Sequence, residues 1–216
     1  MLRASDIHKS FQSIEVLKGI DFRVEKGEIV SIVGASGAGK STLLHILGTL
    51  DKPELGSVVI NDQAVFNLSR RQLSRFRNQH IGFIFQFHNL LPEFSALDNT
   101  CMPAYIANAD VKDAKRKGQE LLNILGLSDR VDHKPSQLSG GEQQRVSVAR
   151  ALINDPVIVF ADEPSGNLDS QNAKEHHALF VKLRESLNQT FVIVTHNKEL
   201  SAMADRRLEI KDGKLV

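Results

Sequence analysis

The chain of 216 residues carries 27 Lys and Arg against 26 Asp and Glu, which leaves a net charge of +1, and 41% of its residues are hydrophobic. This length is sufficient for one domain with a large core. The balanced charge excludes the strong positive field typical of nucleic-acid-binding proteins, so we expect no nucleic-acid partner.

The sequence gives no sign of a membrane span or of a disulfide framework. No apolar run approaches the roughly 20 residues that cross a bilayer, and we expect no signal peptide. The single cysteine, Cys101, excludes an intramolecular disulfide. Because no His/Cys cluster lies near it, we expect a small packed side chain and no metal cluster. We therefore expect a cytosolic protein whose membrane role, if it has one, comes through a partner.

The N-terminal part predicts a small antiparallel sheet. Two strand-like runs, residues 2–7 and 20–25, lie on either side of Phe11 and a polar turn. Residues 56–60, followed by Asn61-Asp62-Gln63, predict a further strand and turn. The ring of Phe11 either stacks on an adenine or packs on a strand edge, and the strand pattern alone leaves both alternatives open.

A glycine-rich loop at residues 34–41 fits the phosphate-binding pattern G-x-x-x-x-G-K-[ST] without departure. The apolar run 28–33 before it predicts a buried strand, and residues 41–47 after it have helical spacing. Glycines allow successive N–H groups to point at an anion, which the positive end of the following helix also faces. Lys40 would reach the β- and γ-phosphates, and the Ser41 hydroxyl would ligate Mg²⁺. The loop therefore predicts nucleotide binding.

The middle of the chain combines a basic helix, a strand and an apolar loop. Residues 69–79 predict a helix whose arginines form a solvated face. Residues 81–85 predict a buried strand that ends at Gln86. Residues 87–94, from Phe87 to Phe94, are irregular and unusually apolar. Such a loop is either tucked into the core or offered to a partner. Residues 96–127 then turn helical.

A second helix start follows at Leu138-Ser139-Gly140-Gly141-Glu142. Ser139 is a good N-cap residue, and residues 142–153 predict the helix. The chain thus has a second helix N-terminus that suits an anion.

Two apolar strands in the last third end at polar residues. Residues 157–161 lead into Asp162 and Glu163, and residues 191–195 lead into His196. Carboxylates at the carboxyl end of a buried parallel strand lie where such sheets bind ligands. The alternatives are a helix cap, a surface carboxylate and a hydrogen-bonded polar side chain. A turn at residues 164–169, a helix through residue 187 and a hairpin around Asp212-Gly213 complete the chain.

Five of these signals, in this order, resemble the ATP-binding-cassette (ABC) ATPases. They are the glycine loop, Gln86 after a strand, Leu138-Ser139-Gly140-Gly141-Glu142, Asp162-Glu163 with Asn167-Leu168-Asp169, and His196. The resemblance covers essentially the whole chain. It implies an α/β fold with a P-loop, RecA-like core, a mainly parallel sheet, an antiparallel β lobe and a small helical lobe near residues 96–137. It also implies one ABC ATPase domain over residues 1–216.

The resemblance implies a role for each motif in ATP hydrolysis. Asp162 and Gln86 would join Ser41 around Mg²⁺, with Gln86 and Lys40 also serving catalysis. Glu163 would polarise the attacking water, and His196 would hydrogen-bond the γ-phosphate. The residues expected to bind the nucleotide are Phe11, Gly34, Ala35, Ser36, Gly37, Ala38, Gly39, Lys40, Ser41 and Thr42.

The same resemblance implies a head-to-tail homodimer with two ATP molecules at the interface. One chain has two helix N-termini suited to anions but only one phosphate loop, and such a dimer uses both. The residues expected to contact the ATP of the other protomer are Ser139, Gly140, Gly141 and Glu142. Asp169 would lie at the interface and couple the two sites.

A finer similarity extends over residues 86–99 and 162–169, toward the LolD lipoprotein-releasing and MacB-type group. Ser165 stands where Thr is usual, Asn197 where Asp is usual, and Phe11 replaces the commoner Tyr. The similarity implies an ATPase subunit that drives release of lipoproteins from the inner membrane toward the outer membrane. Alternatives are a MacB-type efflux ATPase, an FtsE-type cell-division ATPase and, from another class, a soluble nucleic-acid-associated ABC ATPase.

If this similarity holds, the chain lies at the cytoplasmic face of the inner membrane. It would be a peripheral protein bound through integral membrane permease subunits, which would dock near Phe87 to Phe94. The rival interpretation is that these apolar residues pack only within the helical lobe.

Overall fold

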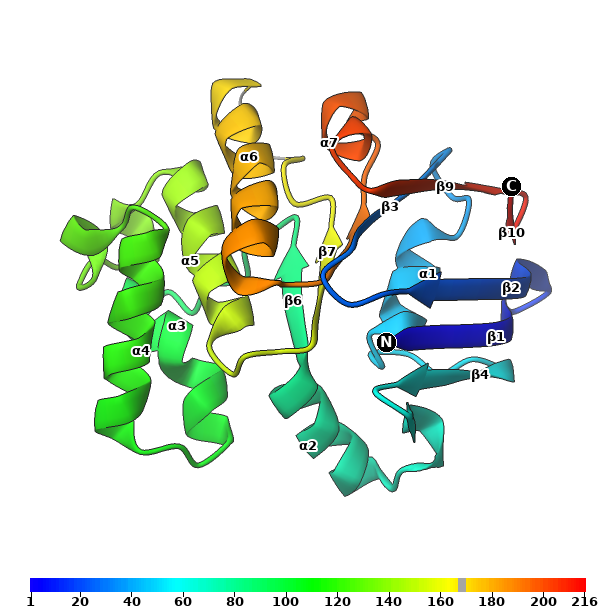
Figure 1. Cartoon of the computed structure of the whole chain (residues 1–216), viewed down its shortest axis with the longest axis horizontal. Helices are drawn as coiled ribbons and strands as arrows, with labels where there is room; N and C mark the ends of the chain where they lie inside the picture. The colour runs from blue at the N-terminus through cyan, green and yellow to red at the C-terminus, as the bar shows by residue number, and fades with distance from the viewer. Residues whose placement is uncertain (167–169) are drawn as a thin grey trace.

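The computed structural model describes residues 1–166 and 170–216, apart from the side chains of residues 170–172. Two β-sheets and the helices around them form layers (Figure 1). The helices are α1 (Lys40–Leu47), α2 (Arg70–His80), α3 (Ala96–Ile106), α4 (Val111–Ile124), α5 (Gly140–Leu152), α6 (Ser170–Leu187) and α7 (Lys198–Ala202), with short 3₁₀ turns η1 (Val65–Asn67), η2 (Ser128–Arg130) and η3 (Pro135–Gln137). In the described part of the chain, no helix is both long and apolar enough to cross a membrane.

The larger sheet is six-stranded and mainly parallel. Its order is β10-β9-β3-β8-β7-β6, and only the short β10 pairs antiparallel. Its strands are β3 (Ile29–Gly34), β6 (Ile81–Phe85), β7 (Ile158–Asp162), β8 (Phe191–Val194), β9 (Arg206–Lys211) and β10 (Lys214–Leu215). The central strands are buried on both faces, which explains why they are continuous apolar runs in the sequence.

The smaller sheet is antiparallel, with the order β2-β1-β4-β5. Its strands are β1 (Leu2–Phe11), β2 (Ile14–Val24), β4 (Leu55–Ile60) and β5 (Gln63–Ala64). The first two are longer than the predicted runs 2–7 and 20–25. The pairing shifts register after Ala4, Ile7 and Lys9, and the outer half of the hairpin is largely exposed. No apolar alternation therefore marks that half in the sequence.

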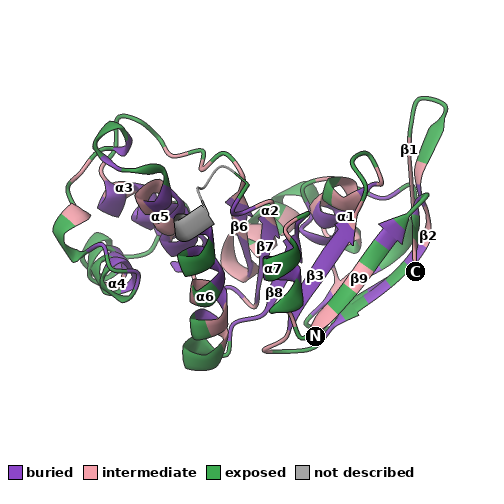
Figure 2. Ribbon diagram, turned by 90° about the horizontal axis from the view of Figure 1, so that it is seen from above, coloured by how far each residue is buried: buried purple, intermediate pink, exposed green. Residues whose placement is uncertain are grey.

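The large sheet separates two hydrophobic cores, because alternate side chains point to opposite faces. Along β7, Ile158 and Phe160 pack with α1 and the antiparallel sheet. Val159 and Ala161 pack with helices α3 to α6 on the other side. The buried strands appear as a continuous band between exposed elements in Figure 2. Cys101 is buried among the helices, where its thiol donates to the Ala114 carbonyl oxygen at 3.2 Å.

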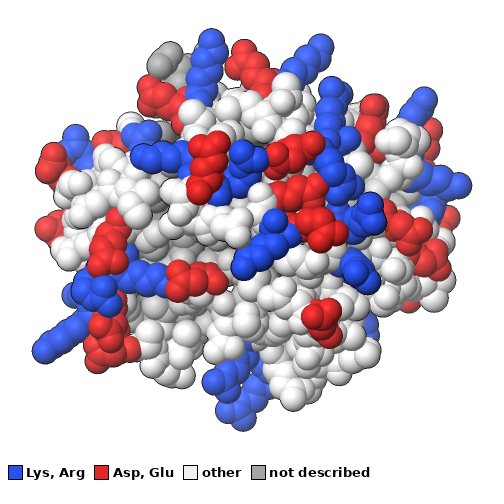
Figure 3. Space-filling view, in the orientation of Figure 1, with Lys and Arg blue, Asp and Glu red and all other residues white. Residues whose placement is uncertain are grey.

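The predicted α/β architecture is confirmed: a mainly parallel core sheet, an antiparallel sheet and a group of helices. Helices α3, α4 and α5 gather on one side of the molecule, and the antiparallel sheet lies on the other (Figure 1). On the face drawn in Figure 3, Lys and Arg are interspersed with Asp and Glu over the upper half, and the lower middle carries few charges. Charges of both signs therefore lie side by side on this face.

A buried histidine on α6 makes stability depend on pH. His176 is 4% exposed and lies edge-on to Phe180, with ring centroids 4.9 Å apart. Burial lowers the pKa of His176 to about 3. The unfolded chain takes up this proton near pH 6.5, whereas the folded chain does not. The free energy of unfolding is therefore greatest above pH 6.5 and falls, by about 1.4 kcal/mol per pH unit, as the pH drops toward 3.

We predict that His176→Leu reduces the loss of stability between pH 7 and pH 5 by about 2 kcal/mol. Urea unfolding at both pH values measures it. Phe191→Leu is the control, because this buried ring contacts Phe180 but does not titrate, and it should lower stability equally at both pH values. An unchanged pH dependence in His176→Leu would contradict the assignment.

Candidate functional site

The candidate site lies at the edge of the large sheet where four parallel strands end. One row of paired residues crosses the sheet there, namely Ile32 in β3, Val194 in β8, Asp162 in β7 and Phe85 in β6. The next residues along these strands lead into the glycine loop, His196, Glu163 and Gln86. Parallel pairing therefore brings four sequence motifs to one edge, the position where such sheets bind ligands.

Two glycines of the loop, Gly34 and Gly39, lie too close to neighbouring strands to carry a side chain. A Cβ on Gly34 would lie 2.4 Å from the carbonyl oxygen of Ile210, and one on Gly39 would lie 2.9 Å from Leu17. Gly39 also has φ +98° and is the N-cap residue of α1, with no side chain accepting from the helix. The first N–H groups of α1 thus have no side-chain partner at the cap, as an anion-binding helix N-terminus requires.

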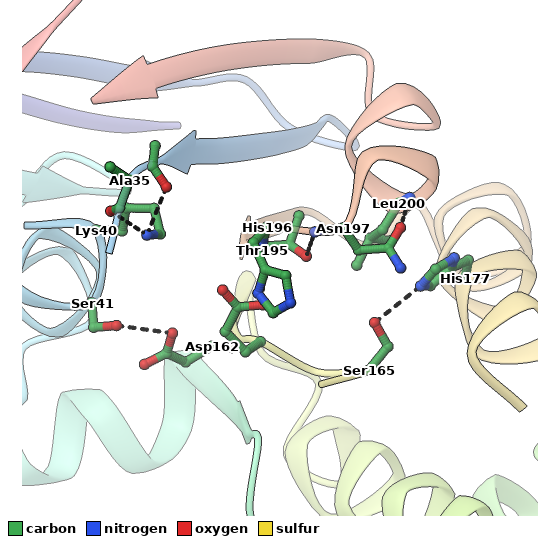
Figure 4. A network of polar contacts seen from close by, with 12 residues as sticks. Ala35, Lys40, Ser41, Asp162, Ser165, His177, Thr195, His196, Asn197 and Leu200 are labelled. Carbon is green, nitrogen blue, oxygen red and sulfur yellow. Dashed lines mark hydrogen bonds and ion pairs between the residues drawn. The ribbon is translucent and has the colours of Figure 1, made fainter. Parts of the chain in front are cut away.

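The side chain of Lys40 folds back onto the glycine loop that precedes it in the chain. Its Nζ donates to the carbonyl oxygens of Gly34 at 3.0 Å and Ala35 at 2.9 Å (Figure 4). The loop residues that face solvent are Ala35, Ser36 and Gly37, whereas Ala38 and Thr42 are half-buried. The ammonium group and the exposed turn therefore lie together at the start of α1.

Ser41 and Asp162 bring two oxygen donors together. The Ser41 hydroxyl donates to Asp162 Oδ1 at 3.1 Å (Figure 4). Burial raises the pKa of Asp162, while the Ser41 bond and the nearby His45 and Lys40 act in the opposite direction. A hydroxyl and a partly buried carboxylate are hard oxygen ligands of the kind that Mg²⁺ prefers, so this pair fits that ion.

Glu163 and His196 form a hydrogen-bonded pair beside this donor pair. His196 Nδ1 donates to Glu163 Oε2 at 2.9 Å, and the His196 backbone N–H donates to the same oxygen at 3.3 Å. The Glu163 side chain is 17% exposed and that of His196 is 71% exposed. Glu163 has φ +46°, an uncommon conformation for a non-glycine residue. Such strained backbone often marks functional residues.

Gln86 lies at this edge, whereas Phe11 belongs to the antiparallel sheet. Gln86 packs against Gly166, since a Cβ on that glycine would lie 2.9 Å from Gln86 Nε2. Phe11 ends β1, is 50% exposed, and has Lys9 Nζ 5.4 Å from its ring centroid. It pairs with Ile14, which lines a hollow of about 510 Å³ shared with residues 35–38 of the glycine loop.

The second helix N-terminus, at α5, is capped by its own side chains. The Glu142 backbone N–H donates to Ser139 Oγ at 3.2 Å, and the Ser139 N–H donates to Glu142 Oε2 at 2.8 Å. The bond that the carboxylate accepts from Ser139, together with Arg130, whose Nε lies 2.9 Å from Glu142 Oε1, lowers the pKa of Glu142. Gly140 is exposed and Gly141 is buried. Ser139 is thus an N-cap residue, as predicted. Helix α5 and helix α1 lie on opposite sides of strands β6 and β7 (Figure 2).

Sequence reasoning missed His45, whose Nε2 lies 3.9 Å from Asp162 Oδ2. The sequence could have indicated His45 by its position four residues after Ser41, because residues with this spacing lie on one face of a helix. The predicted interface residue Asp169, with Asn167 and Leu168, lies outside the described residues.

Two residues that depart from the usual motifs, Asn197 and Ser165, both make hydrogen bonds in the structure. Asn197 caps α7 by accepting from the Leu200 N–H at 3.0 Å (Figure 4). Ser165 keeps a hydroxyl, 3.0 Å from His177 Nε2.

Comparison with known proteins agrees with this geometry. Residues 17–166 match the ABC transporter family. The lipoprotein-releasing system ATP-binding protein LolD of Cytophaga hutchinsonii is 60% identical over 216 residues, which cover 100% of this chain and 99% of the relative. LolD of Bacteroides thetaiotaomicron is 55% identical over 213 residues, with 99% and 98% covered.

Solved structures give the same family. The dimeric structure of MJ0796, a bacterial ABC transporter cassette, aligns with a TM-score of 0.90 and 38% identity, covering 100% of this chain and 96% of that one. A second MJ0796 structure, a post-hydrolysis state bound to ADP and Pi, has a TM-score of 0.90 and 37% identity. This chain therefore belongs to the ABC transporter family.

Proposed function

We propose that this chain is the ATP-hydrolysing subunit of an ABC-type membrane complex that releases lipoproteins from the inner membrane. The observation that carries the proposal is the Glu163–His196 pair, which lies beside Ser41 and Asp162 at the edge where the glycine loop begins. The substrate class follows the full-length relatives, whose name is lipoprotein-releasing system ATP-binding protein. The chain would work at the cytoplasmic face of the membrane as a peripheral subunit.

The loop and α1 would hold the phosphates of ATP. The N–H groups of the loop and of the first turn of α1 would donate to phosphate oxygens, and Lys40 would exchange its loop carbonyl partners for the β- and γ-phosphates. Phe11, whose strand partner Ile14 lines the hollow beside the glycine loop, would stack on the adenine. Ser41, Asp162 and Gln86 would hold Mg²⁺, which would neutralise charge on the transferred phosphoryl group.

Glu163 would orient and polarise the attacking water. Its carboxylate is held by two N–H groups of His196, so its position is defined before a water arrives. Hydrolysis depends mainly on such positioning and on charge neutralisation. When nucleotide binds, His196 would turn its exposed ring toward the γ-phosphate, while its backbone N–H would continue to hold the Glu163 carboxylate.

A homodimer would complete two such sites. The chain offers one glycine loop and a separate helix N-terminus at Ser139, on the other side of β6 and β7. In a head-to-tail pair, residues 139–142 of one protomer would contact the ATP bound to the loop of the other. The MJ0796 cassette, 38% identical to this chain, is a dimer in its structure.

We predict that Glu163→Gln retains ATP binding, accumulates an ATP-bound dimer and lowers phosphate release by about 10²- to 10⁴-fold. The amide keeps the size of the carboxylate but cannot accept a proton from water. Phosphate release, nucleotide titration and size-exclusion chromatography measure the three effects. Glu185→Gln, on an exposed carboxylate of α6, is the control and should change none of them. Near-normal turnover in Glu163→Gln would refute this role.

Residues 87–94, here called the docking loop, would receive a membrane subunit. Phe87, Leu91 and Phe94 are 69%, 41% and 43% exposed. The loop borders a hollow of about 460 Å³ between α2, β6 and α3, to which Asn89, Phe83 and Ile106 contribute. Exposed apolar side chains beside a hollow suit an amphipathic helix.

The charges around the hollow indicate the chemistry of that helix. Arginines line this hollow and an adjoining one of about 450 Å³, namely Arg71, Arg75, Arg77 and Arg150. Among the described residues that line them there is no Asp or Glu. We infer that the occupant is a short cytoplasmic helix of a permease subunit, with an apolar face and at least one carboxylate.

We predict that Leu91→Asp or Phe94→Asp abolishes assembly with the membrane subunits and leaves ATP affinity unchanged, since either adds a charge to an apolar contact. Co-purification and nucleotide titration measure both properties. Ile124→Asp, an equally exposed apolar residue on α4, is the control and should assemble normally. Assembly that survives both loop substitutions would exclude the loop as the docking surface.

The proposed function as a whole is tested by purifying the tagged chain from its native membranes in mild detergent. We expect a membrane protein with few spans and a large periplasmic domain to accompany it, together with lipoproteins. The Leu91→Asp chain, used as the matched bait, should lose both. If an efflux adaptor or a cell-division scaffold co-purified in place of lipoproteins, we would conclude that the chain serves a related complex. Nucleic acid without a membrane subunit would overturn the proposal.

A further inference from the structure

A buried amide on α5 connects two segments of the site that are far apart in sequence. Gln144 is 0% exposed. Its Nε2 donates to the Pro164 carbonyl oxygen at 2.7 Å, and its Oε1 contacts His88 Nδ1 in the docking loop. Pro164 directly follows Glu163 in the chain. One side chain thus touches both the loop proposed to meet the membrane subunit and the turn that carries the proposed catalytic carboxylate.

The orientation of this amide follows from its partners. A carbonyl oxygen can only accept, so the NH₂ group of Gln144 must face Pro164. Its oxygen then faces His88, and His88 Nδ1 must carry the hydrogen. Burial lowers the pKa of His88, which keeps the ring neutral at pH 7 and compatible with this arrangement. Both polar groups of the buried amide are satisfied.

Further hydrogen bonds hold each of the two segments that Gln144 joins. Arg150 donates to the carbonyl oxygens of His88 and Asn89, both at 2.7 Å, which fixes the start of the docking loop on α5. The turn after Glu163 closes through the Gly166 N–H, which donates to the Glu163 carbonyl oxygen at 3.0 Å. The turn starts from the positive φ of Glu163, so a shift of the Pro164 carbonyl would alter the direction of the carboxylate.

We propose that Gln144 is a positioning residue that sets the Glu163 turn relative to the docking loop. This inference rests on the proposed function, because it assigns Gln144 to the hydrolytic site described above. Gln144 would act through the carbonyl group of Pro164. Without its NH₂ group the turn loses its link to α5, and the carboxylate is less well placed for attack by water on a bound phosphate.

The chain provides a matched control. Gln189 is also buried, and its Nε2 also donates to a proline carbonyl oxygen, that of Pro156, at 3.2 Å. Pro156 precedes β7, at the end of that strand opposite Glu163. Gln144→Met and Gln189→Met therefore remove the same group from similar surroundings, and both should lower the melting temperature by similar amounts. Only Gln144→Met removes a contact with the Glu163 turn.

We expect Gln144→Met to lower kcat for ATP hydrolysis by about tenfold or more with KM for ATP unchanged, since small misplacements of reacting groups cost that much. Gln189→Met should keep both constants. Hydrogen exchange of the peptide that contains residues 163–166 should accelerate in Gln144→Met and not in Gln189→Met.

Equal kcat losses in both variants, or unchanged exchange at residues 163–166 in Gln144→Met, would overturn the positioning role. An absence of ATP hydrolysis in the unmodified chain would instead count against the proposed function. In that case the exchange comparison still decides whether Gln144 holds the turn.

Discussion

The site depends on the parallel register of β3, β8, β7 and β6. Because Ile32, Val194, Asp162 and Phe85 share one row, the residues after them emerge at the same level of the sheet edge. A slip of one residue in any strand would turn its side chains to the opposite face. It would also exchange the side chains that belong to the two cores, so the packing that stabilises the sheet is the same packing that aligns the site.

That constraint explains why so much could be predicted from the sequence. Strands buried on both faces are continuous apolar runs, and their ends are marked by the first polar residues. The glycine loop, Gln86, Asp162-Glu163 and Thr195-His196 each follow such a run. The N-cap at Ser139 and the Asp212-Gly213 hairpin are also local signals, readable over a few residues. The fold class and the grouping of the candidate residues follow from these features together with the resemblance.

The features that escaped prediction depend on tertiary contacts or lack a hydrophobic pattern. His88 and Gln144 are 56 residues apart, and Ser165 and His177 are 12 apart, across a turn. No periodicity links such pairs. The outer part of the β1–β2 hairpin is exposed on both faces, so its residues give no alternation to detect. The positive φ of Glu163 belongs to the turn that follows β7. Because the residue is not a glycine, the sequence does not predict this conformation.

The unusual residues of the motifs show which atoms this site requires. Asn197 stands where the family resemblance leads us to expect Asp. It still presents an oxygen to the α7 N-terminus, and Asn and Asp are about equal as N-caps. Ser165 lacks the methyl group of Thr but keeps the hydroxyl that meets His177. Both replacements preserve a hydrogen bond and change only volume or charge at positions away from the Ser41–Asp162 pair. At these two positions a hydrogen-bonding atom is therefore present although the residue type differs from the one that the resemblance leads us to expect.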